Sequence, residues 1–218
     1  MGTSAYGDGY PYLFKTRGVV SSTLTITNPH HGPLAFSIAI YDEYPELFDY
    51  LSSVEVHLFR PAGNYIIEGG AHPSGSSYGM SRMYGMYYAH YLLKIACGGF
   101  ELYNEEKLVD MSLAWIYDKN PDGFRYRYGD QAVYTTAATD YASHSKDTAA
   151  HMIAASLADD EYKKSVIKQF VFQENANLGG FIYWQEAVTP VSVFVFNDLS
   201  VPAQSYKGLP LTRYFPEP

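Results

Sequence analysis

The sequence has few cysteines, few tryptophans and no long apolar run. A single cysteine, Cys97, excludes a disulfide framework and a zinc site built on cysteines. No stretch comes near the roughly 18 apolar residues that a membrane-spanning helix needs, so we expect no membrane segment. The first residues contain no apolar signal core, so the chain as printed carries no export signal.

Basic residues are also scarce. Lys and Arg number 15 against 23 Asp and Glu, which gives a net charge of −8 and disfavours a nucleic-acid partner. The apolar fraction of 47% and the charged fraction of 17% are typical of a globular protein, so wholesale disorder is excluded. A length of 218 residues fits one domain or a large piece of a bigger one.

Tyrosine, in contrast, is abundant, with 22 residues against two tryptophans. Its apolar ring and polar tip suit wet, stacked ligands such as sugars. Tyrosine that replaces phenylalanine in a core is the plainer explanation, and composition leaves both interpretations open.

Start signals and apolar positions at helical spacing predict a mainly helical chain. After a loop-rich lead-in over residues 1–28, Asn28-Pro29 is expected to begin the first helix, followed by the apolar run 34–41. Tyr44-Pro45 marks the break before the second. The helices expected after this break cover about 46–59, 78–97, 104–118, 146–157 and 160–172.

Glycine and proline mark the expected connections. We expect a turn over residues 61–64, a Gly/Ser loop over 68–77 and a helix end at Gly98-Gly99. Cys97 is expected to pack as a small hydrophobe. Residues 191–196 fit a strand or a buried helix piece, and 200–218 read as a Pro-punctuated loop.

Helical pairs joined by long, Tyr-lined connections favour a mainly α fold, an incomplete α/α toroid in which residues 1–218 form a single partial domain. A plain helical bundle stays open on pattern alone.

The segment richest in candidate chemistry is 71–82, where a Gly/Ser loop leads into a helix start. Free backbone N–H groups and the positive end of the helix dipole would lie beside Tyr78. Arg82 follows four residues later and would share a helix face with Tyr78. A guanidinium favours the ionised phenol, which suits a tyrosine that acts as base and acid in turn. A capped helix start with a surface arginine is the structural alternative.

Other clusters are less specific. His30-His31 precede Gly32 at the expected helix start, but no third ligand lies at a zinc-binding spacing, so we predict no metal site in this chain. A carboxylate pair for glycoside hydrolysis could lie among Asp42, Glu43 and Asp130, although nothing in their spacing selects it.

At these residues the sequence resembles the heparinase II/III family of polysaccharide lyases, and most closely its heparinase II members. The resemblance runs in order from about residue 9 to 215. Its elements are Ile38-Ala39-Ile40-Tyr41-Asp42-Glu43-Tyr44-Pro45, Gly75-Ser76-Ser77-Tyr78 with Arg82, Trp115-Ile116-Tyr117, Pro121-Asp122-Gly123, Gly129-Asp130 and Leu209-Pro210-Leu211-Thr212-Arg213-Tyr214-Phe215.

The resemblance implies an N-terminal α/α toroid and cleavage of uronic-acid-containing glycosaminoglycans, such as heparin and heparan sulfate, by β-elimination. Tyr78 matches a family tyrosine that serves as base or acid, and Arg82 matches an arginine that contacts substrate. His31, followed by Gly32, is the best match to a catalytic histidine. His72 and Arg127 are further candidate substrate-binding residues.

The chain also departs from the family. A catalytic glutamate stands two residues after the family's His-Gly element, where this sequence has Leu34. The family's C-terminal antiparallel β-sandwich, with a further catalytic histidine and a zinc site, would lie beyond Pro218, with residues 200–218 leading toward it. The resemblance further implies a periplasmic or secreted protein with an acidic polysaccharide as partner, and it allows a homodimer. It leaves open whether this chain is active by itself.

Two other functions stay open beside the lyase. One is a non-catalytic carbohydrate-binding toroid, and the other is a glycoside hydrolase on the same architecture. The net charge of −8 runs against a polyanionic substrate, but a local basic cluster can still make a cleft positive. Candidates for that cluster are Lys15, Arg17, Arg82, Arg125 and Arg127.

Overall fold

The computed structural model describes residues 27–69, 75–118, 150–177 and 202–212. Helices dominate these residues, and no strand occurs among them, so the expectation of a mainly α chain is confirmed. The expected strand or helix over 191–196 lies outside this part of the chain. None of the helices described is long and apolar enough to cross a membrane.

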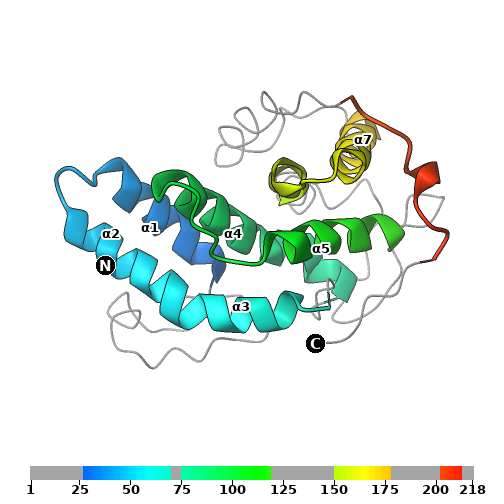
Figure 1. Ribbon diagram of the computed structural model, residues 1–218. Coiled ribbons are helices and arrows are strands. Elements are labelled where there is room, and N and C mark those ends of the chain that lie inside the picture. Colours follow the sequence, from blue (N-terminus) through cyan, green and yellow to red (C-terminus); the bar gives the residue numbers. More distant parts are fainter. Residues whose placement is uncertain (1–26, 70–74, 119–149, 178–201, 213–218) are drawn as a thin grey trace.

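The first half of the chain forms two layers of helices. Helix α1 (Thr27–Ala39) turns at residues 40–44 into α2 (Pro45–Val54), which continues through a π-helical segment, η2 (Glu55–Phe59), into α3 (Arg60–Ile67). Figure 1 shows α2, η2 and α3 as one continuous rod beneath α1 and α4. Helix α4 (Gly75–Ala96) packs against α1.

The second half builds on α5 (Glu105–Tyr117), which contacts α3 and α7 (Glu161–Asn177). Residues 150–157 form another helix. A short 3₁₀ turn, η3 (Tyr206–Gly208), lies against α7 within a loop over residues 202–212. This loop is the described part of the expected Pro-punctuated segment 200–218.

Local chemistry explains most helix ends. The side chain of Asn104 caps α5 by accepting a hydrogen bond from the Lys107 amide at 3.0 Å. At the end of α4, Gly98 has a φ of 62° and the Gly99 amide donates to the Lys94 carbonyl at 2.7 Å. A hydrogen bond from the sixth residue back to the first, with a left-handed glycine between them, is the Schellman motif. It confirms the helix end expected at Gly98-Gly99.

The turn expected over residues 61–64 is wrong, because α3 runs through it. The amide of Arg60 donates to the carbonyl of Glu55, five residues back, in a widened π turn. This turn brings Pro61 into the first turn of α3. Backbone nitrogens in a first turn make no hydrogen bond within the helix, so a proline, which has no N–H, is tolerated there. Gly63 packs closely against the side chains of Tyr103 and Met86. A Cβ added at Gly63 would overlap the ring of Tyr103 and come within 2.9 Å of Met86 Cε. The glycine therefore serves close packing within a helix.

An apolar core joins the described helices of the two halves. Leu34 of α1, Ile67 of α3 and Met86 of α4 are fully buried in it, together with Leu108 of α5 and Ile153 of the helix over 150–157. Burial of a side chain of this size contributes about 1.5–3 kcal/mol to folding.

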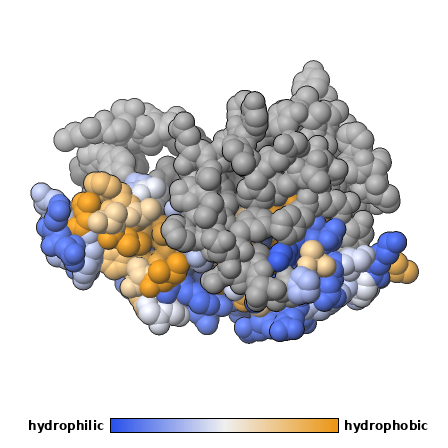
Figure 2. Space-filling model, turned by 90° about the horizontal axis from the view of Figure 1, so that it is seen from above, coloured by the Kyte–Doolittle hydropathy of each residue, from blue (hydrophilic) through white to orange (hydrophobic). Residues whose placement is uncertain are grey.

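The end of the molecule beside α1 carries exposed apolar groups. Phe36 of α1 is 59% exposed and Ile95 of α4 is 63% exposed. Figure 2 shows apolar surface gathered at this end in the view from above. Cys97, expected to pack as a small hydrophobe, is exposed there as well, because it caps α4 at the surface instead of continuing its buried face.

Candidate functional site

The helix that carries the candidate base begins earlier than expected. Helix α4 starts at Gly75, so Tyr78 lies in its first turn and Arg82 lies one turn further on. His31 lies near the start of α1, which packs against α4. The structure describes the backbone but not the side chains of these three residues, so their convergence in one cleft stays a prediction.

The remaining candidates from the sequence fall into two groups. His72 and Arg127 lie outside the described residues, as do Lys15, Arg17 and Arg125 of the expected basic cluster. Leu34, which stands where the family has a glutamate, is fully buried in the apolar core. A carboxylate could not reach a substrate from the place that this side chain occupies.

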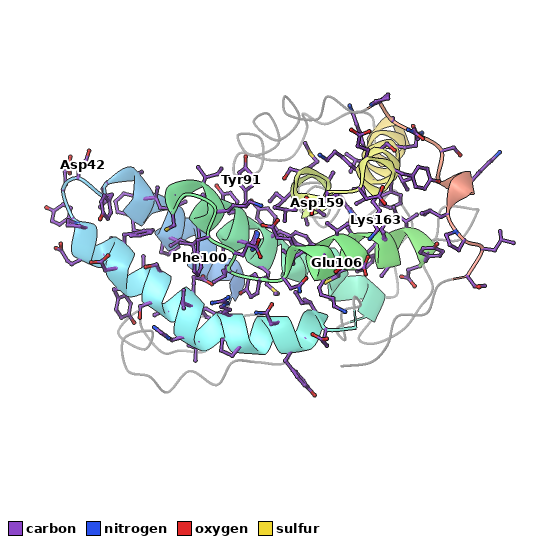
Figure 3. All side chains as sticks on the ribbon, viewed as in Figure 1. Asp42, Tyr91, Phe100, Glu106, Asp159 and Lys163 are labelled. Atoms are coloured by element: carbon purple, nitrogen blue, oxygen red, sulfur yellow. The ribbon has the colours of Figure 1, made fainter. Side chains whose placement is uncertain are left out.

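The carboxylates considered for glycoside hydrolysis do not face a partner across a cleft among the described residues. Asp42 and Glu43 are neighbours in the exposed turn between α1 and α2, and Asp130 lies outside the described residues. Figure 3 shows Asp42 at the outer tip of this turn. An exposed turn of this kind does not set two carboxylates on opposite sides of a bound sugar, as glycoside hydrolysis needs.

Past its first turns, α4 carries a pair of stacked tyrosines. The rings of Tyr84 and Tyr88 lie 5.5 Å apart between centroids and are tilted by only 14°. Tyr84 is 2% exposed, and its burial, followed by the neighbouring Tyr88, raises the pKa of its phenol far above the usual value. Tyr84 therefore stays protonated at neutral pH and is not a candidate base.

Tyr87 has a structural role. Its ring is fully buried, and its hydroxyl donates a hydrogen bond to the Leu108 carbonyl of α5 at 2.6 Å. Burial, with a smaller contribution from Asp110, raises its pKa well above 10.0. Of the described tyrosines on α4, Tyr84 and Tyr87 belong to the packed interior, whereas Tyr88 and Tyr91 are only half-buried.

A buried polar cluster lies where α4 meets α5, and sequence reasoning missed it. His90 of α4 is fully buried, and its Nε2 lies 2.9 Å from Oε1 of Glu105. Lys94, one turn further along α4, donates to both Glu105 oxygens, at 2.5 and 2.7 Å. The Tyr103 amide donates to Nδ1 of His90 at 3.1 Å. We name these four residues the His90 cluster.

Burial and charge compete in the His90 cluster. Burial lowers the pKa of His90, against the hydrogen bond to Glu105, which acts to raise it. Burial alone would raise the pKa of Glu105, but the hydrogen bonds from Lys94 and His90 outweigh it and lower that pKa. At neutral pH the cluster therefore holds a neutral imidazole, a carboxylate and an ammonium group.

A second buried histidine lies about two turns further along α5, beside Ser112. His151 is 2% exposed, and its Nδ1 shares a 2.6 Å hydrogen bond with the hydroxyl of Ser112, which is itself fully buried. The His151 ring also lies edge-on to Phe170 of α7, with centroids 5.0 Å apart. A serine beside a histidine can act as a nucleophile, but this pair is enclosed by the core and serves to join α5, the helix over 150–157 and α7.

Two signals in the sequence could have indicated the His90 cluster. His90 and Lys94 stand four residues apart on one helix, and Glu105 follows a helix-capping asparagine. The Ser112–His151 pair, in contrast, joins residues 39 positions apart and left no local pattern. Among the described residues, no three His, Cys, Asp or Glu side chains lie close enough to hold a metal ion.

The chain was also compared with known proteins. No family model matches it, and neither a curated protein nor a solved structure does. The functional interpretation therefore depends on the residues of this chain.

Proposed function

We propose that this chain is the α/α-toroid part of a polysaccharide lyase that cleaves an acidic, uronate-containing glycosaminoglycan by β-elimination. Tyr78 removes the proton next to the uronate carboxylate and returns a proton to the leaving oxygen, and Arg82 binds the carboxylate or a sulfate. His31 takes part in proton transfer, and His72 and Arg127 contribute to substrate binding.

The position of Tyr78 in the first turn of α4 is the observation that carries this proposal. Backbone N–H groups at a helix start have no partner within the helix, and the positive end of the dipole favours negative charge. A phenolate is therefore more accessible there than in the middle of a helix. The same field attracts the carboxylate on which charge develops during proton abstraction.

The helix contacts are compatible with a toroid. The consecutive helices α1 and α2 contact each other, and α2, η2 and α3 form one rod. Helix α5 joins this layer to α7. Hairpins of this kind, repeated around a central axis, build an α/α toroid, and the start of α4 then lies at one rim of the cleft.

Leu34 favours a second candidate function. Since its side chain is fully buried, the acid that the family uses at this position has no counterpart here. A toroid that binds the polysaccharide without cleaving it would need Arg82 and the aromatic side chains but no catalytic acid.

An absorbance assay for unsaturated uronate separates the two functions. The chain is incubated with heparin, heparan sulfate, chondroitin or alginate, and binding to each polymer is measured in parallel. For a lyase we expect cleavage that Tyr78→Phe lowers by about 10²–10⁴-fold, the usual contribution of one acid–base group, with binding retained. Tyr91→Phe, a half-buried tyrosine later on α4, is the matched control and should leave cleavage unchanged.

The outcomes are distinct. Cleavage that survives Tyr78→Phe contradicts the assignment of Tyr78. Binding that Arg82→Ala weakens, with no cleavage of any polymer, supports the non-catalytic function. A chain that neither binds nor cleaves any of the four polymers contradicts both functions.

A further inference from the structure

Both ring nitrogens of His90 are engaged, and their partners determine its tautomer. A backbone amide can only donate, so the 3.1 Å contact from the Tyr103 amide requires an Nδ1 without a proton. Nε2 then carries the hydrogen and donates it to Oε1 of Glu105 at 2.9 Å. The neutral ring thus joins α4 both to the connection before α5 and to the first turn of α5.

We propose that His90 is a proton-operated latch, whose neutral form holds the connection over residues 97–104 against α4 and whose protonated form releases it. A second proton must enter at Nδ1, since Nε2 already carries one. The ring N–H then points at the Tyr103 N–H, and two donors cannot share a hydrogen bond. Protonation therefore converts the attraction between His90 and the connection into a repulsion.

The groups that face His90 come from three elements. Lys94 lies on the same helix, Glu101 and Tyr103 lie on the connection, and Glu105 lies on α5. The two glutamates favour a charged ring, whereas burial and Lys94 oppose it. Because Lys94 occupies both oxygens of Glu105, this carboxylate is partly neutralised before the ring gains its second proton.

Release of Tyr103 also affects the contacts of the connection with α3 and α5. Its ring is stacked on His90, with centroids 6.3 Å apart, and it fills the space left by the missing side chain of Gly63 on α3. The next residue, Asn104, donates its amide to Oδ1 of Asn64 on α3 and caps α5 with its side chain. The latch therefore controls the junction of α3, α4 and α5.

The pH at which the latch acts follows from the direction of the shift. The folded protein lowers the pKa of His90 below its value of about 6.5 in an unfolded chain. Between these two pKa values the unfolded chain binds more protons than the folded one. The stability that the latch contributes is thus complete above about pH 6.5 and is lost as the pH falls toward the folded pKa.

Two substitutions of His90 remove the titrating ring, and each of them keeps a different one of its two hydrogen bonds. In His90→Asn, the amide oxygen replaces Nδ1 as acceptor for the Tyr103 amide. In His90→Gln, the amide nitrogen replaces Nε2 as donor to Glu105. The matched control is His57→Asn, which removes an exposed histidine from the π-helical segment.

The test is amide hydrogen exchange at Tyr103 together with nitrogen NMR of the imidazole, in the complete chain, from about pH 7.5 to pH 5. We expect the Nε2–H tautomer at neutral pH. The protection of the Tyr103 amide, corrected for intrinsic exchange, should fall about tenfold per pH unit below the pKa of His90, since the neutral fraction falls at that rate. His57→Asn should behave as the wild type, and His90→Asn should retain protection at every pH.

Two results would overturn the latch. One is an Nδ1–H tautomer at neutral pH, which the wild-type protein alone reveals even when the variants do not fold. The other is a pH dependence at Tyr103 that is the same in the wild type and in His90→Asn. Neither measurement involves a polysaccharide, so the latch stands or falls independently of the proposed function.

Discussion

The start and the centre of α5 are joined to their neighbours by different chemistry. At its start, the charged side chains of Glu105 and Lys94 meet the buried ring of His90, close enough to the surface that Lys94 is 35% exposed. At its centre, the Ser112 hydroxyl and the His151 ring share a hydrogen bond that the core encloses. Both regions bury a histidine, and in the first of them the ring lies beside a carboxylate.

This difference teaches what each histidine can do. A ring between a carboxylate and a backbone amide changes its partners when it gains a proton, so it can respond to pH. A ring between a hydroxyl and an aromatic face serves mainly to fill volume and to satisfy a buried polar group. The first region should therefore be sensitive to pH, and the second should be sensitive to loss of volume.

The largest expected effect is at the enclosed pair. We expect His151→Ala to lower the free energy of unfolding by about 3 kcal/mol, because it leaves a cavity beside Phe170 and removes the partner of the buried Ser112 hydroxyl. Urea unfolding at pH 7 measures the change. His57→Ala, at an exposed histidine, should stay within about 0.5 kcal/mol. Equal effects of the two substitutions would mean that the Ser112–His151 pair does not stabilise the core.

A smaller effect is expected at the connection before α5. Gly63→Ala should cost about 1–3 kcal/mol, because the new Cβ overlaps the ring of Tyr103 and forces it away from His90. Gly32→Ala is the matched control, since an added Cβ on α1 meets nothing within 4 Å. That control should be neutral or stabilising, because alanine is the better helix former. A Gly63→Ala protein as stable as the control would contradict the close packing of α3 against Tyr103.

The smallest effect is expected at the far end of α5. The hydroxyl of Tyr117 donates to the Pro210 carbonyl at 2.9 Å and so joins two of the segments that carry the family resemblance. Tyr117→Phe should lower the free energy of unfolding by about 0.5–1.5 kcal/mol, the usual contribution of one hydrogen bond. It should also speed proteolysis within residues 202–212. Tyr65→Phe removes the same hydroxyl from a side chain that is 65% exposed and should change neither quantity.

Most of the helices could be predicted from the sequence because their signals are local. Asn104 caps α5, and Gly98-Gly99 ends α4, through contacts that span five residues or fewer. Leu108, Met111 and Trp115 recur at helical spacing on α5, and all three are buried as their spacing predicts. The helix expected over 160–172 is present as α7, which Asp160 caps by accepting from the amides of Tyr162 and Lys163.

The error at Pro61 and Gly63 has a physical cause, which is that neighbouring structure outweighs the local signal. Pro61 and Gly63 are typical turn residues, but the π turn before them and the ring of Tyr103 beside them favour a helix. Ile95 continues the apolar spacing of α4 into its last turn, but its side chain is 63% exposed.

For the candidate site, the local chemistry at the start of α4 was predictable and the distant contacts were not. The Gly/Ser-rich sequence before Tyr78 predicts a helix start, and α4 begins at Gly75, three residues before Tyr78. The partners of His90 lie 13 and 15 residues away, and the partner of His151 lies 39 residues away. No periodicity within one helix carries information about such pairs.

By itself, therefore, the sequence determined where most of the described helices begin or end, which of their faces are apolar, and that Tyr78 and Arg82 lie on adjacent turns at a helix start. These properties depend on hydrogen bonds and spacing within one element. Only the tertiary structure decided that Leu34 is core, that Tyr87 holds α5, and that His90 and His151 pack against different partners. Burial and charge at these residues depend on side chains that the chain brings together from distant positions, and there the packing of helices determines the chemistry.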